Sequence, residues 1–455
     1  MPQISIINKS DVQKAHRFDA EFFKPEFLKR IKILKQNFSF LDKFITKGSY
    51  GILPKSDDYI EEGLPLIRGK DLRRNDIEKE NLVKVPESYY SEKYKVSKGD
   101  LLILVKGATI AFPDGVLLIQ KDIGNAIFNG SVFRIKLNKN INKYFLYVFM
   151  TSRYFTFQKE REVANNGIEY NSLNTIKKYL IPILSQHFQL EIEKIVKSAY
   201  KKQTQSKQLY KEAEGMLLKE LDLIGYEPRH ILNFETTKKK TDEAKRFDAG
   251  YFQPKYEEII KKIENYQNGY DVVKNIANIK KGVEVGSETY QQDGMSFGRV
   301  SDFSINGVEG TGKKISKELY QDLKEDYQPK RDDILFTKDG TIGLSYVVKE
   351  EFEIILSGAF LRLSLKEKYQ NFEKECLVLV FNSIVCKMQI EKLSGGAVIA
   401  HLKPSDFEKF RIPLIKSKIQ KEIAKKIKES HKLNKESKEL LEEAKRKVEQ
   451  EIEKK

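Results

Sequence analysis

The chain has 455 residues, which allows two to four domains at about 150 residues each, and its 40% hydrophobic and 11% aromatic residues argue against disorder. Lys and Arg total 82 against 66 Asp and Glu, a net charge of +16 that favours polyanionic partners, first nucleic acid and second an anionic membrane surface. No apolar run approaches the roughly 18 residues of a membrane span, and the N-terminal residues lack the apolar core of a signal peptide, so a soluble, cytoplasmic protein is expected.

The first predicted element is an aromatic segment that occurs twice. Residues 17–25 read Arg-Phe-Asp-Ala-Glu-Phe-Phe-Lys-Pro, and residues 246–254 read Arg-Phe-Asp-Ala-Gly-Tyr-Phe-Gln-Pro, an offset of 229 residues. Because proline suits the first helical position and disfavours helix in the residue before it, short amphipathic helices are predicted to begin at Pro25 and Pro254. The aromatic pairs inside the two segments are interpreted as hydrophobic anchors in preference to base-stacking platforms.

A strand-rich stretch follows in each half. Apolar runs of strand length lie at residues 101–105 and 334–336, each behind a turn-like pair, Gly99-Asp100 or Arg331-Asp332. Residues 130–135 and 358–363 form a second matched pair of predicted strands. The two stretches therefore predict two compact mixed domains, each of about 150 residues.

A basic turn follows the first strand of each pair. Residues 106–111 read Lys-Gly-Ala-Thr-Ile-Ala, and residues 338–343 read Lys-Asp-Gly-Thr-Ile-Gly, an offset of 232 residues. This alignment gives Lys106 and Lys338 one position in the repeat, where a turn that contains glycine lets the backbone and a lysine approach a phosphate closely. A lysine at the same position of both repeats is therefore interpreted as a phosphate-positioning residue.

Each half ends in a long predicted helix. Residues 186–221, behind Ile181-Pro182, contain no proline, and their apolar residues recur at spacings of three and four. A second such stripe runs from Ile412-Pro413 to the C-terminus. A helix on the order of 55 Å long cannot bury its stripe on one small domain, so the two are predicted to pack on each other as a coiled coil. Their Lys- and Glu-rich faces are interpreted as solvated surface.

Three matched landmarks in one order indicate a duplicated unit of roughly 230 residues, too long for a solenoid repeat. The predicted fold class is α+β, with two similar mixed, strand-rich domains separated by two long antiparallel helices and related by a pseudo-two-fold axis. The predicted boundaries are residues 1–184 for the first domain, 185–227 for the central helix, 228–415 for the second domain and 416–455 for the C-terminal helix. Cys376 and Cys386 are predicted to be core thiols in a reducing compartment, and the five histidines have no metal-binding spacing.

The order of these landmarks resembles the specificity (S) subunit of type I restriction-modification systems. The resemblance rests on the Arg-Phe-Asp-Ala segments, the strand with its Lys-x-Gly/Ala-Thr-Ile-Gly/Ala turn, the Ile-Pro before each long helix, the Gln-x-Glu-Ile at residues 189–192 and 420–423, and above all on the duplication. It covers nearly the whole chain. Two departures concern Arg331, which stands where many members have Gly before the Asp, and residues 185–187, which replace a second proline.

The resemblance implies two target recognition domains that each read one half of a bipartite, asymmetric DNA site. It also implies that the long helices dock two methyltransferase (modification) subunits, and that restriction (motor nuclease) subunits complete the complex. S-adenosylmethionine is expected in the methyltransferase, while this chain is expected to be non-catalytic, without cofactor or metal, because no nuclease, amino-methyltransferase or phosphate-loop motif is complete in it.

Three alternatives stay open. The chain could be a coiled-coil DNA-binding adaptor without sequence specificity, the specificity subunit of a type IIB-like system, or an autonomous nuclease or methyltransferase whose motifs escape recognition.

Candidate DNA contacts come from residue types that reach phosphates and base edges. Residues 165–167 (Asn-Asn-Gly) and 394–396 (Ser-Gly-Gly) suit groove loops and ordinary turns equally well. The predicted DNA-binding residues are Arg68, Lys70, Arg73, Arg74, Lys106 and Thr109 in the first domain, and Arg299, Ser301, Lys338 and Thr341 in the second.

Overall fold

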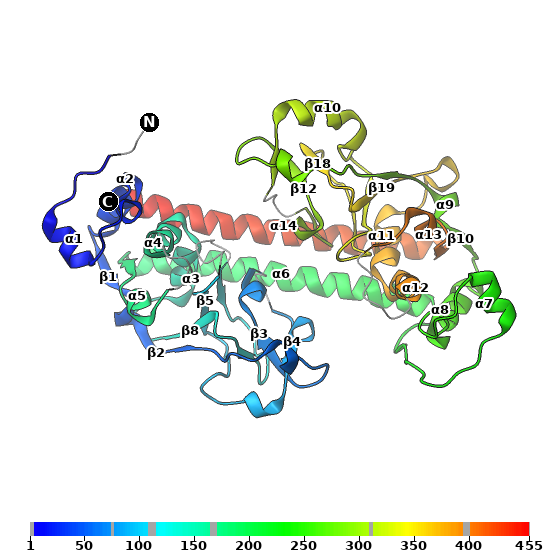
Figure 1. Cartoon of the computed structure of the whole chain (residues 1–455), viewed down its shortest axis with the longest axis horizontal. Coiled ribbons are helices and arrows are strands. Elements are labelled where there is room, and N and C mark those ends of the chain that lie inside the picture. The colour runs from blue at the N-terminus through cyan, green and yellow to red at the C-terminus, as the bar shows by residue number, and fades with distance from the viewer. Residues whose placement is uncertain are drawn as a thin grey trace. The chain divides into compact units, whose positions relative to one another are not determined.

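The computed structural model describes residues 4–73, 77–107, 115–163, 171–308, 313–394 and 401–454. The chain forms two compact units, unit 1 from Met1–Lys201 with Glu436–Lys455, and unit 2 from Lys202–Lys435. Each unit combines small sheets, short helices and parts of both long helices, so the fold is α+β as predicted (Figure 1). The unit boundaries cut across the two long helices, whereas the predicted domain boundaries set these helices apart from the domains.

The described residues of unit 1 form three small sheets, of strand order β2-β8-β5-β6, β4-β3-β7 and β1-β9. Its strands are β1 (Phe38–Phe40), β2 (Ile45–Tyr50), β3 (Leu64–Ile67), β4 (Val83–Val85), β5 (Leu101–Leu104), β6 (Val116–Leu118), β7 (Ile127–Phe128), β8 (Val132–Leu137) and β9 (Leu180–Pro182). Its α-helices, besides the long ones, are α1 (Lys9–Ala15), α2 (Pro25–Leu34), α3 (Lys143–Thr151), α4 (Arg153–Val163) and α5 (Leu173–Lys177).

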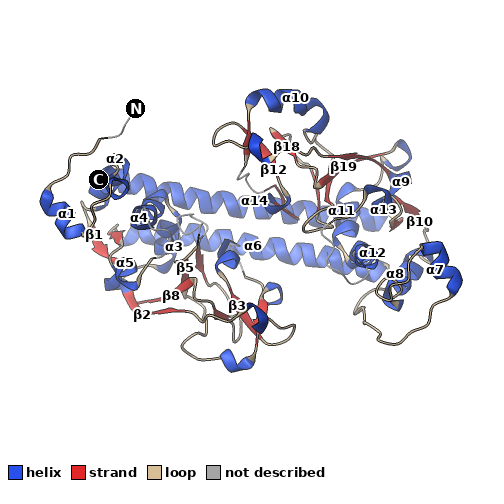
Figure 2. Ribbon diagram, in the orientation of Figure 1, coloured by secondary structure: helices blue, strands red, loops and turns tan. Residues whose placement is uncertain are grey.

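Unit 2 contains sheets of strand order β11-β19-β16-β17, β15-β12-β18 and β10-β20, and the hairpin β13-β14 (Figure 2). Its strands are β10 (Tyr270–Val272), β11 (Ala277–Lys281), β12 (Met295–Gly298), β13 (Phe303–Ser304), β14 (Gly307–Val308), β15 (Lys314–Ile315), β16 (Ile334–Thr337), β17 (Ser345–Val347), β18 (Ile354–Leu356), β19 (Phe360–Leu365) and β20 (Arg411–Pro413). Its shorter helices are α7 (Lys238–Ala244), α8 (Pro254–Glu264), α9 (Val273–Ile276), α10 (Lys317–Tyr327), α11 (Lys374–Asn382), α12 (Ile384–Ser394) and α13 (Pro404–Phe407).

The sequence repeat is a repeat of topology. The four-stranded sheets have one order in both units, and in each three-stranded sheet the central strand pairs antiparallel on one side and parallel on the other. Helices α2 and α8 begin at Pro25 and Pro254, as predicted. The strand before each long helix pairs with a short strand that follows α2 or α8, which fixes where the long helix starts.

The backbone register corrects the sequence alignment of the basic turns by one residue. Val105 donates its N–H to Ser131 and accepts from Asn171, and Lys338 makes the same pair of backbone bonds, to Ala359 and from Leu402. Lys338 is therefore the counterpart of Val105, Asp339 that of Lys106, and the predicted equivalence of Lys106 with Lys338 is wrong.

The same register shows which residue before strand β16 stands at the position that Gly99 has before strand β5. Gly99 has φ 95°, and Asp332, its counterpart, has φ 72°. Aspartate is one of the few residues that tolerate this left-handed conformation. The residue at the glycine position is thus Asp332, and Arg331 lies one residue earlier.

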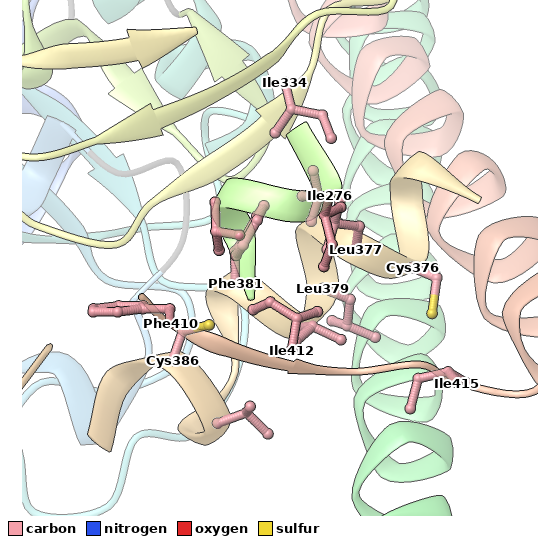
Figure 3. Close-up of a cluster of buried hydrophobic side chains, with 14 of the residues drawn as sticks. Ile276, Ile334, Cys376, Leu377, Leu379, Phe381, Cys386, Phe410, Ile412 and Ile415 are labelled. Atoms are coloured by element: carbon pink, nitrogen blue, oxygen red, sulfur yellow. The ribbon is translucent and has the colours of Figure 1, made fainter. Parts of the chain in front are cut away.

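Each unit has its own apolar core. In unit 2 the core gathers side chains from α11, α12, β16 and β20, and Figure 3 shows Cys376, Leu377, Leu379 and Phe381 of α11 within it. Cys376 and Cys386 are free thiols with 0% exposure, which confirms the prediction of core cysteines. Burial raises the pKa of both thiols, so neither is poised to react as a thiolate.

The two long helices are α6 (Gln186–Glu220) and α14 (Ser417–Glu453). In unit 1, Ile192 and Val196 of α6 pack with Ala444 and Val448 of α14. In unit 2, Ala213 and Leu217 of α6 join Ile423 and Ile427 of α14 in the core. The helices pair antiparallel, because along α6 the α14 partners descend in number, from Lys447 to Ser437 in unit 1 and from Ser430 to Lys426 in unit 2. No helix in the described ranges is long and apolar enough to span a membrane.

Two glutamines, Gln189 and the buried Gln420, hold the starts of the long helices. Gln189 accepts the Asn142 N–H (3.0 Å) and donates to the Leu184 carbonyl (3.0 Å). Gln420 repeats both bonds, with Glu373 N–H (2.9 Å) and the Ile415 carbonyl. The glutamine of the repeated Gln-x-Glu-Ile is thus a scaffold residue that ties the helix to the segment packed beside it.

Candidate nucleic-acid interface

The first part of the site is the turn that follows β3 in unit 1 and β12 in unit 2. Asp71 accepts the backbone N–H (2.9 Å) and the side-chain Nε (3.2 Å) of Arg68. Asp302 makes the same two bonds to Arg299, at 3.3 and 3.4 Å. Each arginine is therefore held against its own turn, with side-chain exposures of 17% and 36%.

The second part is the turn that follows β5 and β16. Lys106 is exposed. Gly107, which follows Lys106, has φ 118°, and its counterpart in unit 2, Gly340, has φ 67°. Lys338, by contrast, is 1% exposed, and its Nζ lies 2.5 Å from Asp339 Oδ2 and 3.4 Å from His401 Nδ1. The ammonium of Lys338 is thus sequestered in this structure, while that of Lys106 faces solvent.

The two turns are neighbours within each unit. A Cβ on Gly69 would lie 2.5 Å from Leu104, at the end of the strand that leads to Lys106. In unit 2 the side chain of Val300 lies 3.9 Å from a Cβ built on Gly340. Each unit therefore brings together two chain segments that lie roughly 40 residues apart in the sequence, and the candidate basic residues gather where strands end.

A third segment reaches the same place. Asn171 bonds to the Val105 carbonyl (2.9 Å), and Leu402 bonds to the Lys338 carbonyl (2.7 Å). These bonds directly follow residues 164–170 and 395–400, which include most of the two predicted groove loops and lie outside the described residues.

The predicted residues have different surroundings. Lys70 and Lys106 of unit 1, and Ser301 and Thr341 of unit 2, are exposed. Arg68 and Arg299 are partly buried ion-paired residues, and Lys338 is buried. The side chain of Arg73, and all of Arg74 and Thr109, lie outside the described residues.

An arginine that is buried in unit 1 and nearly buried in unit 2 supports the site, and sequence reasoning missed it. Arg134 of β8 is 0% exposed and donates to the carbonyls of Lys93 (2.8 Å) and Lys95. Its Nε lies 3.9 Å from Asp100, and burial raises the pKa of that carboxyl. The arginine fastens the loop that precedes β5.

The same support occurs in unit 2. Arg362 of β19 donates to the carbonyls of Asp326 (2.9 Å) and Gln328, and its Nε lies 3.5 Å from Asp333. Burial raises the pKa of Asp333. The sequence does repeat an aspartate before one strand and an arginine inside another. Only the pairing of these two strands shows that the aspartate and the arginine lie close together.

The units differ beside this shared scaffold. In unit 1 the segment between β3 and β5 contains β4 and single-turn 3-10 helices, whereas in unit 2 the segment between β12 and β16 contains the hairpin β13-β14, β15 and the 11-residue helix α10. No cluster of three or more metal-ligating side chains occurs in the described ranges. The described turns expose Lys70 and Lys106 in unit 1 and the hydroxyl residues Ser301 and Thr341 in unit 2, groups that can bind an anionic ligand.

Comparison with known proteins gives the following similarities. Residues 273–446 match the family model "Type I restriction modification DNA specificity domain". The S subunit of a type I restriction-modification system from M. genitalium is 14% identical, with 91% of this chain and 95% of that chain covered and a TM-score of 0.41. The HsdS subunit from Thermoanaerobacter tengcongensis is 13% identical, with 91% and 95% covered and a TM-score of 0.29.

A third solved chain comes from a structural study of complex assembly and conformational transition of the type I R-M system. It is 13% identical, covers 92% of this chain over 96% of its own length, and has a TM-score of 0.28. No curated protein matches the sequence significantly.

Proposed function

Because residues 273–446 carry a type I restriction modification DNA specificity domain, we propose that the chain is the DNA sequence-specificity subunit of a type I restriction-modification complex. The observation that carries this proposal to the whole chain is the repeated topology. Unit 1 has the strand orders of unit 2, although most of unit 1 lies outside the matched residues. The simplest interpretation of such a repeat is that unit 1 is a second DNA-recognition domain with the same topology.

Each unit would read one half of a bipartite DNA site. The shared elements, which include the Arg-Asp turn and the buried arginine, would position the phosphates and hold the loops. The segments that differ between the units would contact different bases, so the two half-sites would differ and the whole site would be asymmetric. The net charge of +16 supports the sequence-independent part of binding.

The chemistry would belong to partners. Two methyltransferase subunits would dock on the chain, bind S-adenosylmethionine and methylate a flipped adenine on each strand. A restriction subunit with motor and nuclease activity would complete the complex. The chain itself would recognise the DNA sequence and bind the other subunits, without catalysing a reaction. It would act in the cytoplasm, where the DNA is.

The test is base-modification sequencing of DNA from cells that express the chain with its cognate methyltransferase, compared with cells that express the methyltransferase alone. The expected result is a new methyladenine signal at one split, asymmetric motif. A methyltransferase that binds the chain yet methylates no defined motif would overturn sequence specificity and favour the coiled-coil adaptor.

The type IIB-like alternative differs in where DNA is cut. Cleavage by the assembled complex on both sides of the recognition site would favour the type IIB-like system, and cleavage far from the site would favour type I. The purified chain alone is expected to neither cut nor methylate DNA, and activity from it would establish the enzymatic alternative.

A further inference from the structure

The Arg-Phe-Asp-Ala segments have the same structure in both units. Each follows a seven-residue helix, α1 or α7, that ends at a left-handed residue, His16 with φ 51° or Lys245 with φ 53°. We call residues 16–20 and 245–249 the two platforms. Their backbone is fixed by the arginine and aspartate on either side of the phenylalanine.

The arginine of each platform contacts the platform's aspartate, a helix carbonyl and an aromatic ring. Arg17 Nε lies 2.7 Å from Asp19, and Arg17 Nη1 donates to the Glu162 carbonyl at 3.3 Å. Its guanidinium also lies 4.8 Å from the ring of Phe22. This side chain therefore ties the platform to the C-terminal part of α4.

The second platform repeats these contacts. Arg246 Nε lies 2.7 Å from Asp248, and its Nη1 donates to the Leu393 carbonyl at 2.8 Å, near the end of α12. The guanidinium lies 4.6 Å from the ring of Tyr251. Both platforms are thus rigid, and neither leaves the backbone at the phenylalanine free to turn the ring inward.

The phenylalanine between these two residues has no comparable structural role. Phe18 is 86% exposed and Phe247 is 82% exposed. The neighbouring repeated landmarks have visible functions in the fold: arginine and aspartate pair, proline begins a helix, and the glutamines anchor the long helices. A large aromatic ring held in water at the same position of both units costs hydrophobic free energy that burial by a partner would recover.

We propose that Phe18 and Phe247 are equivalent docking anchors, each of which inserts into an apolar, acid-rimmed pocket on one of two identical methyltransferase subunits. This inference rests on the proposed function and adds one anchor residue in each unit to the docking surface expected along the long helices. The number two follows from the repeat, because surfaces that read different bases diverge, whereas surfaces that bind two copies of one protein stay alike.

The surroundings of the anchors argue for the chemistry of the partner. Helices α1 and α7 bury no residue and carry more Lys than Asp or Glu. At the start of α7, Lys239 pairs with Glu243 and Lys240 pairs with Glu257, and Lys238 lies beside them. Beside Phe247, a hollow of about 470 Å³ is lined by Leu232, Phe234 and Phe252 as well as by polar residues. An aromatic anchor inside a basic rim fits an apolar pocket with acidic edges.

The experiment is a stoichiometry measurement by native mass spectrometry on the full chain with its methyltransferase. The variants are Phe18→Ala, Phe247→Ala and the double variant. The wild-type chain is expected to bind two copies. Each single variant is expected to weaken one of the two binding events at least about tenfold and to leave the other unchanged, and the double variant is expected to weaken both.

Phe40→Ala is the matched control, because Phe40 is an exposed phenylalanine (45%) of unit 1 outside the repeated segment. It is expected to bind two copies as the wild type does. DNA binding by each variant without methyltransferase is expected to be unchanged, since the rings are exposed and the platforms keep their ion pairs.

Other outcomes would overturn the docking inference. Two copies bound equally well by the double variant would show that docking lies elsewhere. Loss of DNA binding with stoichiometry retained would assign the rings to the DNA interface, and loss of a self-association of the chain would assign them to a second copy. A wild-type chain that binds no methyltransferase would overturn the proposed function itself, which a failure confined to the variants would not.

Discussion

An aspartate holds the arginine of the first turn in each unit, whereas the lysines of the second turn differ, because Lys106 is exposed and Lys338 is buried. The Arg68 and Arg299 turns could be matched because an aspartate follows each arginine at the same spacing. The Lys106–Lys338 match failed because identical letters were aligned, whereas the register of the strands aligns Gly107 with Gly340. The buried Arg134 could not be found, since a charged residue in a strand is a core residue only once its carbonyl partners are known.

The salt dependence of DNA binding tests the exposed lysines. Lys70→Ala and Lys106→Ala are each expected to reduce the slope of log K against log salt concentration by about 0.9, because each removes one phosphate contact. Lys338→Met is expected to leave the slope unchanged and to lower stability, because Asp339 loses the Lys338 ammonium and keeps only the His401 ring beside it. Fluorescence anisotropy at several salt concentrations provides the slopes.

The control for these lysines is Lys32→Ala on α2, an exposed lysine on a helix that packs against α4. It should keep the wild-type slope. An unchanged slope for both Lys70→Ala and Lys106→Ala would remove the two turns from the DNA interface.

His431 of α14 predicts acid sensitivity of unit 2. Burial, with the nearby charge of Lys349, lowers the pKa of His431 to about 4 from 6.5, while Glu375 opposes the shift. In the unfolded state His431 is therefore protonated below pH 6.5, whereas in the folded state it is protonated only below about pH 4. Stability contributed by the neutral ring is present above pH 6.5 and is lost as pH falls, by on the order of 2 kcal/mol for a partly exposed ring.

His431→Gln is expected to flatten the pH dependence of the unfolding free energy between pH 6.5 and pH 4. His187→Gln, on an exposed residue of α6, should retain the wild-type dependence. Urea titrations at a series of pH values measure both, and equal slopes for wild type and His431→Gln would contradict the assignment.

At the scale of elements, periodicity and proline positions predicted several of the helices. The short strands depend on tertiary pairing and could not be predicted in this way. Helices α2 and α8 could be placed from Pro25 and Pro254, and α6 from its apolar stripe. The three-residue strands β1 and β9 could not, because a strand that short has no detectable alternation and exists only through its partner. Helix α10 lies where the described part of unit 1 has single-turn 3-10 helices. This difference could not be predicted either, because no repeated landmark marks the segment.

The close approach of α6 and α14 depends on small residues. Ser206 Oγ donates to the Ser430 carbonyl at 2.7 Å, and Ser430 Oγ donates back to the Ser206 carbonyl at 2.8 Å, both within unit 2. In unit 1, Ser437 Oγ donates to the Ala199 carbonyl at 2.7 Å. Serines at these positions satisfy their own hydroxyls and allow the backbones to meet.

Ser206→Leu is expected to destabilise the protein by roughly 1–3 kcal/mol, because the larger side chain would push the helices apart and break the reciprocal bonds. Gln205→Leu, on the exposed face one residue earlier, is the control and should change stability by less than about 0.5 kcal/mol. Chemical denaturation followed by circular dichroism measures the difference. A Ser206→Leu chain as stable as the control would show that the helix contact is loose.

At the scale of the whole molecule, the two-reader proposal predicts that specificity can be exchanged one unit at a time. Unit 1 is built from both ends of the chain, and its reading loops all lie in residues 1–184. Replacing these residues by the equivalent domain of a related chain should change one half-site. The other half-site and the number of unread base pairs should stay as they are, because unit 2 and both long helices are retained.

The structure also says what such a chimera must keep. The Arg153 backbone N–H donates to Glu449 at 2.8 Å, and the Tyr154 hydroxyl donates to Glu453 at 2.8 Å, so the first domain is bound to the end of α14 through specific pairs. A chimera that also exchanges Glu436–Lys455 carries a matched helix end, and it should be more stable than the exchange of 1–184 alone while reading the same new half-site. Methylome sequencing gives both half-sites. If either chimera changed both half-sites together, the units would not read independently, and the division of labour inferred from the repeat would be wrong.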